Sequence, residues 1–176
     1  MFQAVDGILR MQLFGRGLLI VALALSGVAV VTGAELAGSD APDFVLKAVD
    51  GKNYRLSEYR GEVVLVSFWA SWCGECRSQL EDLSDLFERV AGADLEMLAV
   101  SLDRDRSEVT DAAKALGVAF PALHDVGGEV GEQYDVDKLP YVVLIDRDGV
   151  VRYEFSGYQR GDEGMYLERA RELLAE

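Results

Sequence analysis

The only two cysteines of this 176-residue chain, Cys73 and Cys76, come shortly after an almost unbroken apolar run at residues 63–69. A run of that kind is typical of a strand buried on both faces. Apolar residues then recur at helical spacing up to Gly92, which predicts a helix that begins at the cysteines. The two thiols would lie one helical turn apart, within disulfide reach and at the positive end of the helix dipole. Because thiolate is favoured there, the pattern predicts a reactive thiol pair where a central strand feeds a helix.

Strands and helices alternate along the rest of the chain. The further elements predicted are, in order, a hairpin over residues 43–48 and 52–56, a strand over 95–102, a helix over 107–116 with Ser107 as its N-cap, a short helix over 128–134, a second hairpin over 141–146 and 150–155, and a closing helix over 162–174. This order favours an α/β fold with a central mixed sheet. Half of the residues are hydrophobic, which is enough for one domain with its own core.

The N-terminus has the pattern of an export signal. Arg10 and Arg16 precede an uncharged stretch of 14 residues, 18–31. That length is usual for a signal-peptide core and short for a helix that crosses about 30 Å of hydrocarbon. Small residues before Ala34 predict cleavage after it, and an uncleaved membrane anchor is the alternative. Either version places the rest of the chain outside the cytoplasm.

The chain therefore divides into a signal peptide or anchor at residues 1–34 and a folded domain at 35–176, with Met11 as an alternative start. The exported part has 15 basic and 30 acidic residues, a net charge of −15. Nucleic acid is a poor partner for so acidic a surface. The acidic residues spread along the whole domain, so we interpret them as a solvated surface.

Two structural roles for the cysteine pair are weaker interpretations. A disulfide between neighbours three residues apart closes too small a loop to stabilise the fold much. A metal site needs about four ligands, and His124 is the only other obvious candidate. We therefore expect no metal site, and we interpret His124 as a scaffold or surface residue.

Five further segments resemble one known family. They are residues 41–44, 56–61, 64–73, 134–140 and 144–149. Together they make the chain similar to the TlpA/ResA-like thiol-disulfide oxidoreductases. A Trp-Cys-x-x-Cys segment followed by a distant Leu-Pro loop is much more specific than a lone Cys-x-x-Cys. The resemblance implies a thioredoxin-like fold, in which helices flank a central mixed sheet and an N-terminal β-hairpin is added.

The resemblance also implies an activity. Members of that family exchange dithiols for disulfides with protein substrates in the periplasm or on the outer face of the plasma membrane, and many serve cytochrome c maturation. We expect a disulfide reductase whose protein substrate is apocytochrome c, another oxidoreductase or a general set of clients, and whose dithiol is renewed by a membrane electron donor. No dissociable cofactor is expected, because the cysteine pair itself carries the two electrons.

The expected roles of the site residues follow from their positions. Cys73, at the helix start, is expected to be the exposed attacking thiolate, and Cys76 the more buried thiol that resolves the mixed disulfide. The resemblance implies that Pro140 follows a cis bond and that the Leu139 backbone pairs with an incoming substrate strand. The residues expected to support the site are Trp72, Gly74 and Glu75.

Four positions depart from the family pattern. Glu75 stands where many relatives have proline, and its charge is predicted to raise the pKa of the Cys73 thiol. Gln79 replaces a functional glutamate of some relatives, and Ser67 replaces a buried aspartate of cytosolic thioredoxins. The residue that handles protons is therefore not evident. Tyr141 replaces a threonine after the proline, which alters the expected fit of the substrate.

Two other functions are considered. Peroxiredoxins have a similar sheet and leading hairpin, but their Pro-x-x-x-Thr-x-x-Cys segment is absent, since Val66 and Ala70 stand at the required spacings before Cys73. The non-enzymatic alternative is a thioredoxin-fold binding module whose cysteines are incidental.

Overall fold

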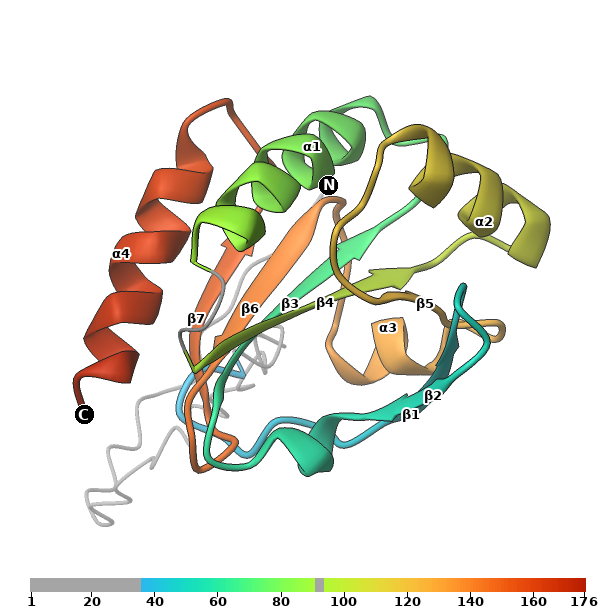
Figure 1. Cartoon of the computed structure of the whole chain (residues 1–176). Coiled ribbons are helices and arrows are strands. Elements are labelled where there is room, and N and C mark those ends of the chain that lie inside the picture. Colours follow the sequence, from blue (N-terminus) through green and yellow to red (C-terminus); the bar gives the residue numbers. More distant parts are fainter. Residues whose placement is uncertain (1–35, 91–93) are drawn as a thin grey trace, which may run out of the picture. The chain divides into compact units, whose positions relative to one another are not determined.

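The computed structural model describes residues 36–90 and 94–176, which form a seven-stranded sheet with helices on both faces (Figure 1). The elements are β1 (Val45–Ala48), β2 (Asn53–Arg55), the 3-10 helix η1 (Leu56–Tyr59), β3 (Val63–Trp69), α1 (Gly74–Arg89), β4 (Leu95–Ser101), α2 (Arg106–Ala115), β5 (Ala122–His124), α3 (Glu129–Gln133), β6 (Tyr141–Ile145), β7 (Val151–Ser156) and α4 (Asp162–Leu174). The strand order is β2-β1-β5-β4-β3-β6-β7. β4 is parallel to β3 and β5, and the other four pairings are antiparallel. The predicted α/β fold with an N-terminal hairpin is confirmed.

Strand β3 shows why the sheet is covered on both sides. All seven of its residues are buried. Its odd-numbered apolar residues belong to a core cluster shared with α1, α2 and α4, whereas its even-numbered residues belong to a second cluster shared with η1 and α3. Successive side chains of a strand point to opposite faces, so an unbroken apolar run has to be buried from both sides. Figure 1 shows α1, α2 and α4 on one face and α3 on the other.

The parallel strands β3, β4 and β5 all end at the same edge of the sheet. Trp69 at the end of β3 pairs with Ser101 of β4, and Ser101 pairs with His124 at the end of β5. The loops that leave these three residues therefore start side by side. In open α/β sheets, ligands bind at the carboxyl ends of the strands.

Two local expectations differ from the structure or fall outside it. Ser107 was expected to cap α2, but the N-cap is Asp105, whose carbonyl accepts hydrogen bonds from the N–H groups of Glu108 at 3.1 Å and Val109 at 3.4 Å. The first intrahelical bonds therefore form before Ser107 can serve as a cap. Gly92, expected to end α1, lies outside the described residues, and α1 ends at Arg89.

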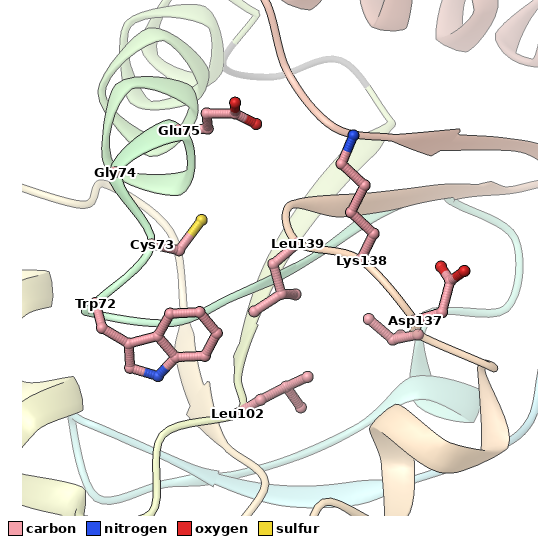
Figure 2. A pocket seen from close by; sticks show the side chains of 9 residues that line it. Trp72, Cys73, Gly74, Glu75, Leu102, Asp137, Lys138 and Leu139 are labelled. Atoms are coloured by element: carbon pink, nitrogen blue, oxygen red, sulfur yellow. The ribbon is translucent and has the colours of Figure 1, made fainter.

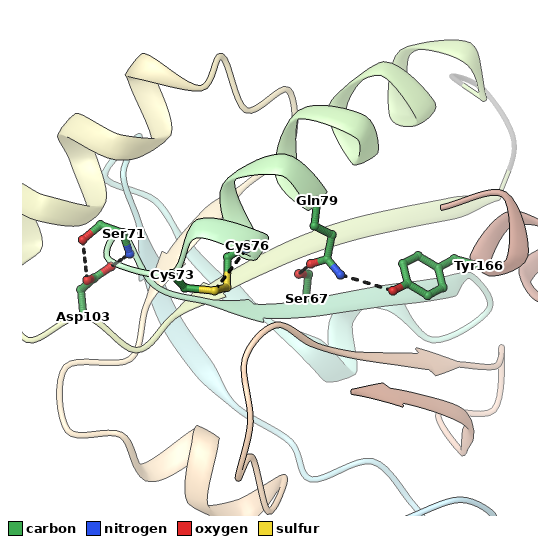
Figure 3. The surroundings of a disulfide bond; sticks show 7 residues. All are labelled: Ser67, Ser71, Cys73, Cys76, Gln79, Asp103 and Tyr166. Atoms are coloured by element: carbon green, nitrogen blue, oxygen red, sulfur yellow. Dashed lines mark hydrogen bonds between the residues drawn. A yellow bond between two sulfur atoms is a disulfide. The ribbon is translucent and has the colours of Figure 1, made fainter. Parts of the chain in front are cut away.

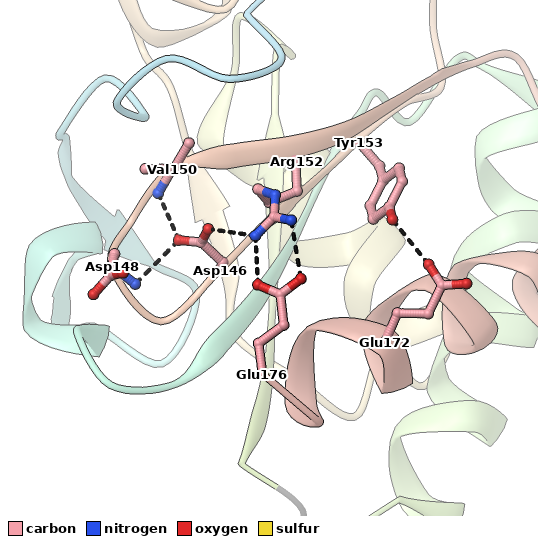
Figure 4. Close-up of polar contacts among 7 residues, drawn as sticks. All are labelled: Asp146, Asp148, Val150, Arg152, Tyr153, Glu172 and Glu176. Atoms are coloured by element: carbon pink, nitrogen blue, oxygen red, sulfur yellow. Dashed lines mark hydrogen bonds and ion pairs between the residues drawn. The ribbon is translucent and has the colours of Figure 1, made fainter.

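Polar contacts fasten the C-terminal helix to the last hairpin (Figure 4). The Arg152 guanidinium of β7 donates to both carboxylate oxygens of Glu176, at 2.6 and 2.9 Å, and to Asp146 at 3.0 Å. Tyr153 donates to Glu172 of α4 at 2.8 Å. Burial opposes ionisation of Asp146, but donation from the Val150 N–H and from Arg152 outweighs it and lowers the pKa of that carboxyl.

Residues 38–41, the N-terminal strap, lie along the outer edge of β7. The Gly38 N–H donates to the Val151 carbonyl at 2.7 Å, and the Val151 N–H donates to the Ser39 carbonyl at 2.9 Å. A third bond of 2.9 Å runs from the Ala41 N–H to the Gly149 carbonyl. Since β7 ends the sheet, the strap satisfies the outward N–H and carbonyl of Val151, the first residue of β7.

The predicted signal peptide or anchor at residues 1–34 lies outside the described residues. Within the described ranges, every helix is too short or too polar to cross a membrane.

Candidate active site

Cys73 and Cys76 form a disulfide at the start of α1 (Figure 3). Their sulfurs are 2.02 Å apart and their Cα atoms 5.3 Å apart. Cys73 is the N-cap of α1, and its Sγ accepts a hydrogen bond from the Cys76 backbone N–H at 3.1 Å. A first-turn N–H that has no intrahelical partner is thus directed at the sulfur, where it favours negative charge.

The two sulfurs differ in access in the expected order, but Cys73 is less open than expected. Cys73 retains 8% of its surface and Cys76 none. The reason is packing, since both residues belong to the core cluster between the sheet and α1. Of the two cysteines, only Cys73 lines the adjacent pocket described in the next paragraph. A partner protein can therefore approach the disulfide from the side of Cys73.

That pocket, called the site pocket here, has a volume of about 730 Å³ (Figure 2). Its lining residues are Trp72, Cys73, Gly74, Glu75, Leu102, Val136, Asp137, Lys138 and Leu139. Five of the seven residues predicted for the site therefore meet in one cavity. The other two, Cys76 and Pro140, are buried beside it.

The register between β6 and β3 brings the distant proline loop to the cysteines. Tyr141, the first residue of β6, pairs with Phe68 near the end of antiparallel β3. Residues just before β6 therefore lie beside residues just after β3. Leu139 joins the wall of the site pocket, and the bond between Leu139 and Pro140 is cis.

Four pocket residues were missed by sequence reasoning. They are Leu102, Val136, Asp137 and Lys138. Leu102 directly follows β4, and the other three directly precede Leu139, so the parallel order of strands and the position of the proline loop were the available signals. No local pattern of their own marks them.

The rim of the site pocket is amphipathic. Trp72 is 72% exposed, unusually open for so large an apolar side chain. Glu75, Asp137 and Lys138 are exposed around it and carry a net charge of −1. An exposed aromatic ring beside charged groups is typical of a surface that another protein contacts.

A buried polar chain lies behind the cysteines (Figure 3). The Ser67 hydroxyl of β3 donates to the side-chain Oε1 of Gln79 in α1 at 2.8 Å. The side-chain Nε2 of Gln79 donates to the Tyr166 hydroxyl of α4 at 3.4 Å. Burial raises the pKa of Tyr166 to about 12. The chain is therefore neutral at physiological pH, and it links strand, active-site helix and closing helix without a carboxylate.

His124 has a structural position. It is buried at the end of β5, and its Nε2 lies 2.9 Å from the Asp103 carbonyl oxygen. In the part of the chain that the structure describes, no group of three or more His, Cys, Asp or Glu residues is arranged to hold a metal ion.

Comparisons with known proteins agree with this geometry. Residues 37–154 match the AhpC/TSA family. The chain is 34% identical over 146 residues to the thiol-disulfide oxidoreductase ResA of Geobacillus kaustophilus, covering 80% of this chain and 84% of that protein.

Solved structures give the same result. A putative thiol:disulfide interchange protein DsbE from Chlorobium tepidum has a TM-score of 0.74 at 29% identity, covering 78% of this chain and 97% of the other. The exposed lipoprotein thioredoxin Etrx1 of Streptococcus pneumoniae has a TM-score of 0.67 at 33% identity, covering 75% and 100%. A thioredoxin-like sheet, a disulfide at a helix start and these relatives lead to one assignment: the chain belongs to the AhpC/TSA family and is a ResA-like thiol-disulfide oxidoreductase.

Proposed function

We propose that this protein reduces disulfides of protein substrates outside the cytoplasm, with Cys73 as the attacking thiolate and Cys76 as the resolving thiol. The observation that carries the proposal is the unequal access of the two sulfurs, because only Cys73 lines the site pocket. A substrate sulfur can approach Cys73 from the pocket, whereas Cys76 has no exposed surface and does not line the pocket.

The proposed reaction has two displacements that start from the dithiol form. The Cys73 thiolate attacks one sulfur of a substrate disulfide, whose S–S bond breaks and releases a substrate thiolate that takes up a proton. The Cys76 thiolate then attacks the Cys73 sulfur of the mixed disulfide and releases the second substrate thiol. Two electrons pass to the substrate, and the protein ends as the disulfide seen in Figure 3.

Residues around the pair support these steps. The Cys76 N–H, 3.1 Å from the Cys73 sulfur, stabilises a thiolate there. Leu139 and Trp72 offer apolar contact for a substrate segment in the lining of the site pocket. We assign Gly74 to leaving open space for that segment, since a Cβ there would meet nothing within 4 Å. We propose that Pro140 holds the backbone of Leu139 in position at the site pocket.

The location and partners rest on the N-terminal segment and on the relatives. An uncharged stretch at residues 18–31 behind two arginines favours export or anchoring. One similar solved protein is described as an exposed lipoprotein. We propose that the renewing dithiol belongs to a membrane electron donor and that apocytochrome c is a substrate, as the ResA-like pattern implies.

Direction of electron flow is tested by the reduction potential of residues 35–176, equilibrated with glutathione buffers. A reductant is expected to have a potential near or below about −250 mV. A value near about −120 mV would indicate an oxidant and would contradict the proposed direction while leaving the exchange chemistry intact.

Replacing Glu75 by proline is expected to lower the pKa of the Cys73 thiol. The carboxylate next to the pair repels a thiolate, and exposure to water limits the change to less than about one pH unit. The measurement is the pH dependence of alkylation of the reduced protein. Glu75→Gln is the matched control, since it removes the charge and keeps the backbone N–H. An unchanged or higher pKa in both variants would contradict the assignment.

A further inference from the structure

Asp103 is a buried carboxylate that the proposed reaction does not use. It follows β4 directly and is 2% exposed. Its Oδ2 accepts a hydrogen bond from the Ser71 N–H at 2.9 Å, and its Oδ1 accepts from the Ser71 hydroxyl at 2.8 Å (Figure 3). Oδ2 also accepts from the Ser101 hydroxyl at 2.8 Å. Burying a carboxylate is costly unless hydrogen bonds satisfy it, and these three contacts do so.

The contacts use Oδ2 of Asp103 as an acceptor twice, and the Ser71 hydroxyl can donate to Oδ1. The Ser71 N–H can only donate. The Ser101 hydroxyl accepts from the Asp103 N–H at 3.1 Å, so its own proton is free to point at the carboxylate. A carboxylate anion offers only acceptors, which matches all three contacts.

These contacts hold the turn that carries the reactive sulfur. Ser71 lies two residues before Cys73, and the turn is closed by a 3.1 Å hydrogen bond from the Cys73 N–H to the Ala70 carbonyl. The Asp103 carboxylate is hydrogen-bonded to both the backbone N–H and the hydroxyl of Ser71. The backbone carbonyl oxygen of Asp103 lies 2.9 Å from Nε2 of His124. One residue thus joins the loops that leave β3, β4 and β5.

We infer that Asp103 is a positioning residue for the redox pair: it fixes the turn before Cys73 and places a buried negative charge close to the attacking sulfur. Two residues span at most about 7 Å, so the charge lies within about 10 Å of Cys73. The other charged groups at the site pocket, Glu75, Asp137 and Lys138, are exposed and screened by water. The Asp103 charge is not screened in that way, so it is expected to disfavour the thiolate.

The inference rests on the proposed role of Cys73, and Asp103→Asn tests it in the full-length, reduced protein. Asparagine is nearly isosteric and can still accept from the Ser71 N–H, so the turn is retained while the charge is lost. Alkylation by iodoacetamide across pH, with labelled cysteine identified by mass spectrometry, is expected to give a Cys73 thiol pKa lower by on the order of one unit.

Asp125→Asn is the matched control. Asp125 is also buried and follows β5 at the same edge of the sheet, but its carboxylate accepts from the Val130 and Gly131 N–H groups of α3. The pKa of the Cys73 thiol is expected to change by less than a third as much in this variant.

The possible outcomes distinguish the positioning role of Asp103 from the proposed function of Cys73. An unchanged or higher pKa in a folded Asp103→Asn protein, or an equal fall in both variants, overturns the inference and leaves the proposed function standing. Failure of Cys73 to react at all overturns the proposed function first. If Asp103→Asn does not fold, Asp103→Ser removes the charge and keeps a hydroxyl, and the same fall in pKa is expected.

Discussion

Replacing Cys73 by serine is expected to abolish disulfide reduction, lowering the rate on a protein disulfide such as insulin by on the order of 10³-fold or more. The serine hydroxyl is not ionised at neutral pH, so it cannot displace a thiolate from a disulfide. The fold is expected to survive, because the Cys73–Cys76 bridge spans a sequence separation of only three and constrains the unfolded chain little. The rate of insulin reduction measures the loss of activity, and NMR or circular dichroism of the same sample shows whether the fold is retained.

Cys76→Ser is the matched control for that experiment. It keeps the attacking sulfur and removes the resolving one, so the protein is expected to accumulate as a mixed disulfide with the substrate. Full activity in Cys73→Ser, or labelling of Cys76 alone in the reduced native protein, would reverse the assigned roles. Rapid peroxide consumption by the reduced wild-type protein would favour the peroxiredoxin alternative.

Replacing Phe68 by alanine is expected to lower the free energy of unfolding by about 3–5 kcal/mol. Phe68 is fully buried in β3, and its ring centroid lies 5.1 Å from that of Tyr134 and 6.1 Å from that of Tyr141. The change removes apolar area and both aromatic contacts, and strand β3 cannot collapse into the space because neighbours pair with it on both sides. Urea unfolding should show a lower midpoint with an unchanged slope.

The control for Phe68→Ala is Val126→Ala, at a side chain that is 73% exposed in the loop after β5. Its free energy of unfolding is expected to stay within about 0.5 kcal/mol of wild type. A loss below about 1 kcal/mol for Phe68→Ala would mean that the even-numbered face of β3 is not the packed core described above.

The parts of the fold that were predictable from sequence are those where one local signal dominates. The apolar run of β3 has to be buried on both faces, and the apolar residues after Cys76 recur at helical spacing. The sequence therefore predicted both elements close to their observed bounds. The range predicted for α4 is also its observed range. The cap of α2 was wrong because Asp105 and Ser107 are both good capping residues, and only the backbone decides between them.

The rest of the site depends on contacts between distant segments. Asp137 and Lys138 reach the site pocket because β6 pairs with β3 in one register. Asp103 reaches Ser71 because β4 is parallel to β3 and ends at the same edge. Asp103 has no periodic or motif signal, and the family-like segment 134–140 does not mark Asp137 and Lys138 as pocket residues. The chemistry of the pair was therefore predictable, while these surroundings were not.

The N-terminal strap sets a limit on how far the chain can be shortened from its start. A cut after Ala34 leaves residues 38–41 in place, and β7 keeps its hydrogen-bonded border. Trimming beyond Ala41 would leave the outward N–H and carbonyl of Val151 unpaired at the sheet edge, and unpaired edge groups can pair with strands of other molecules.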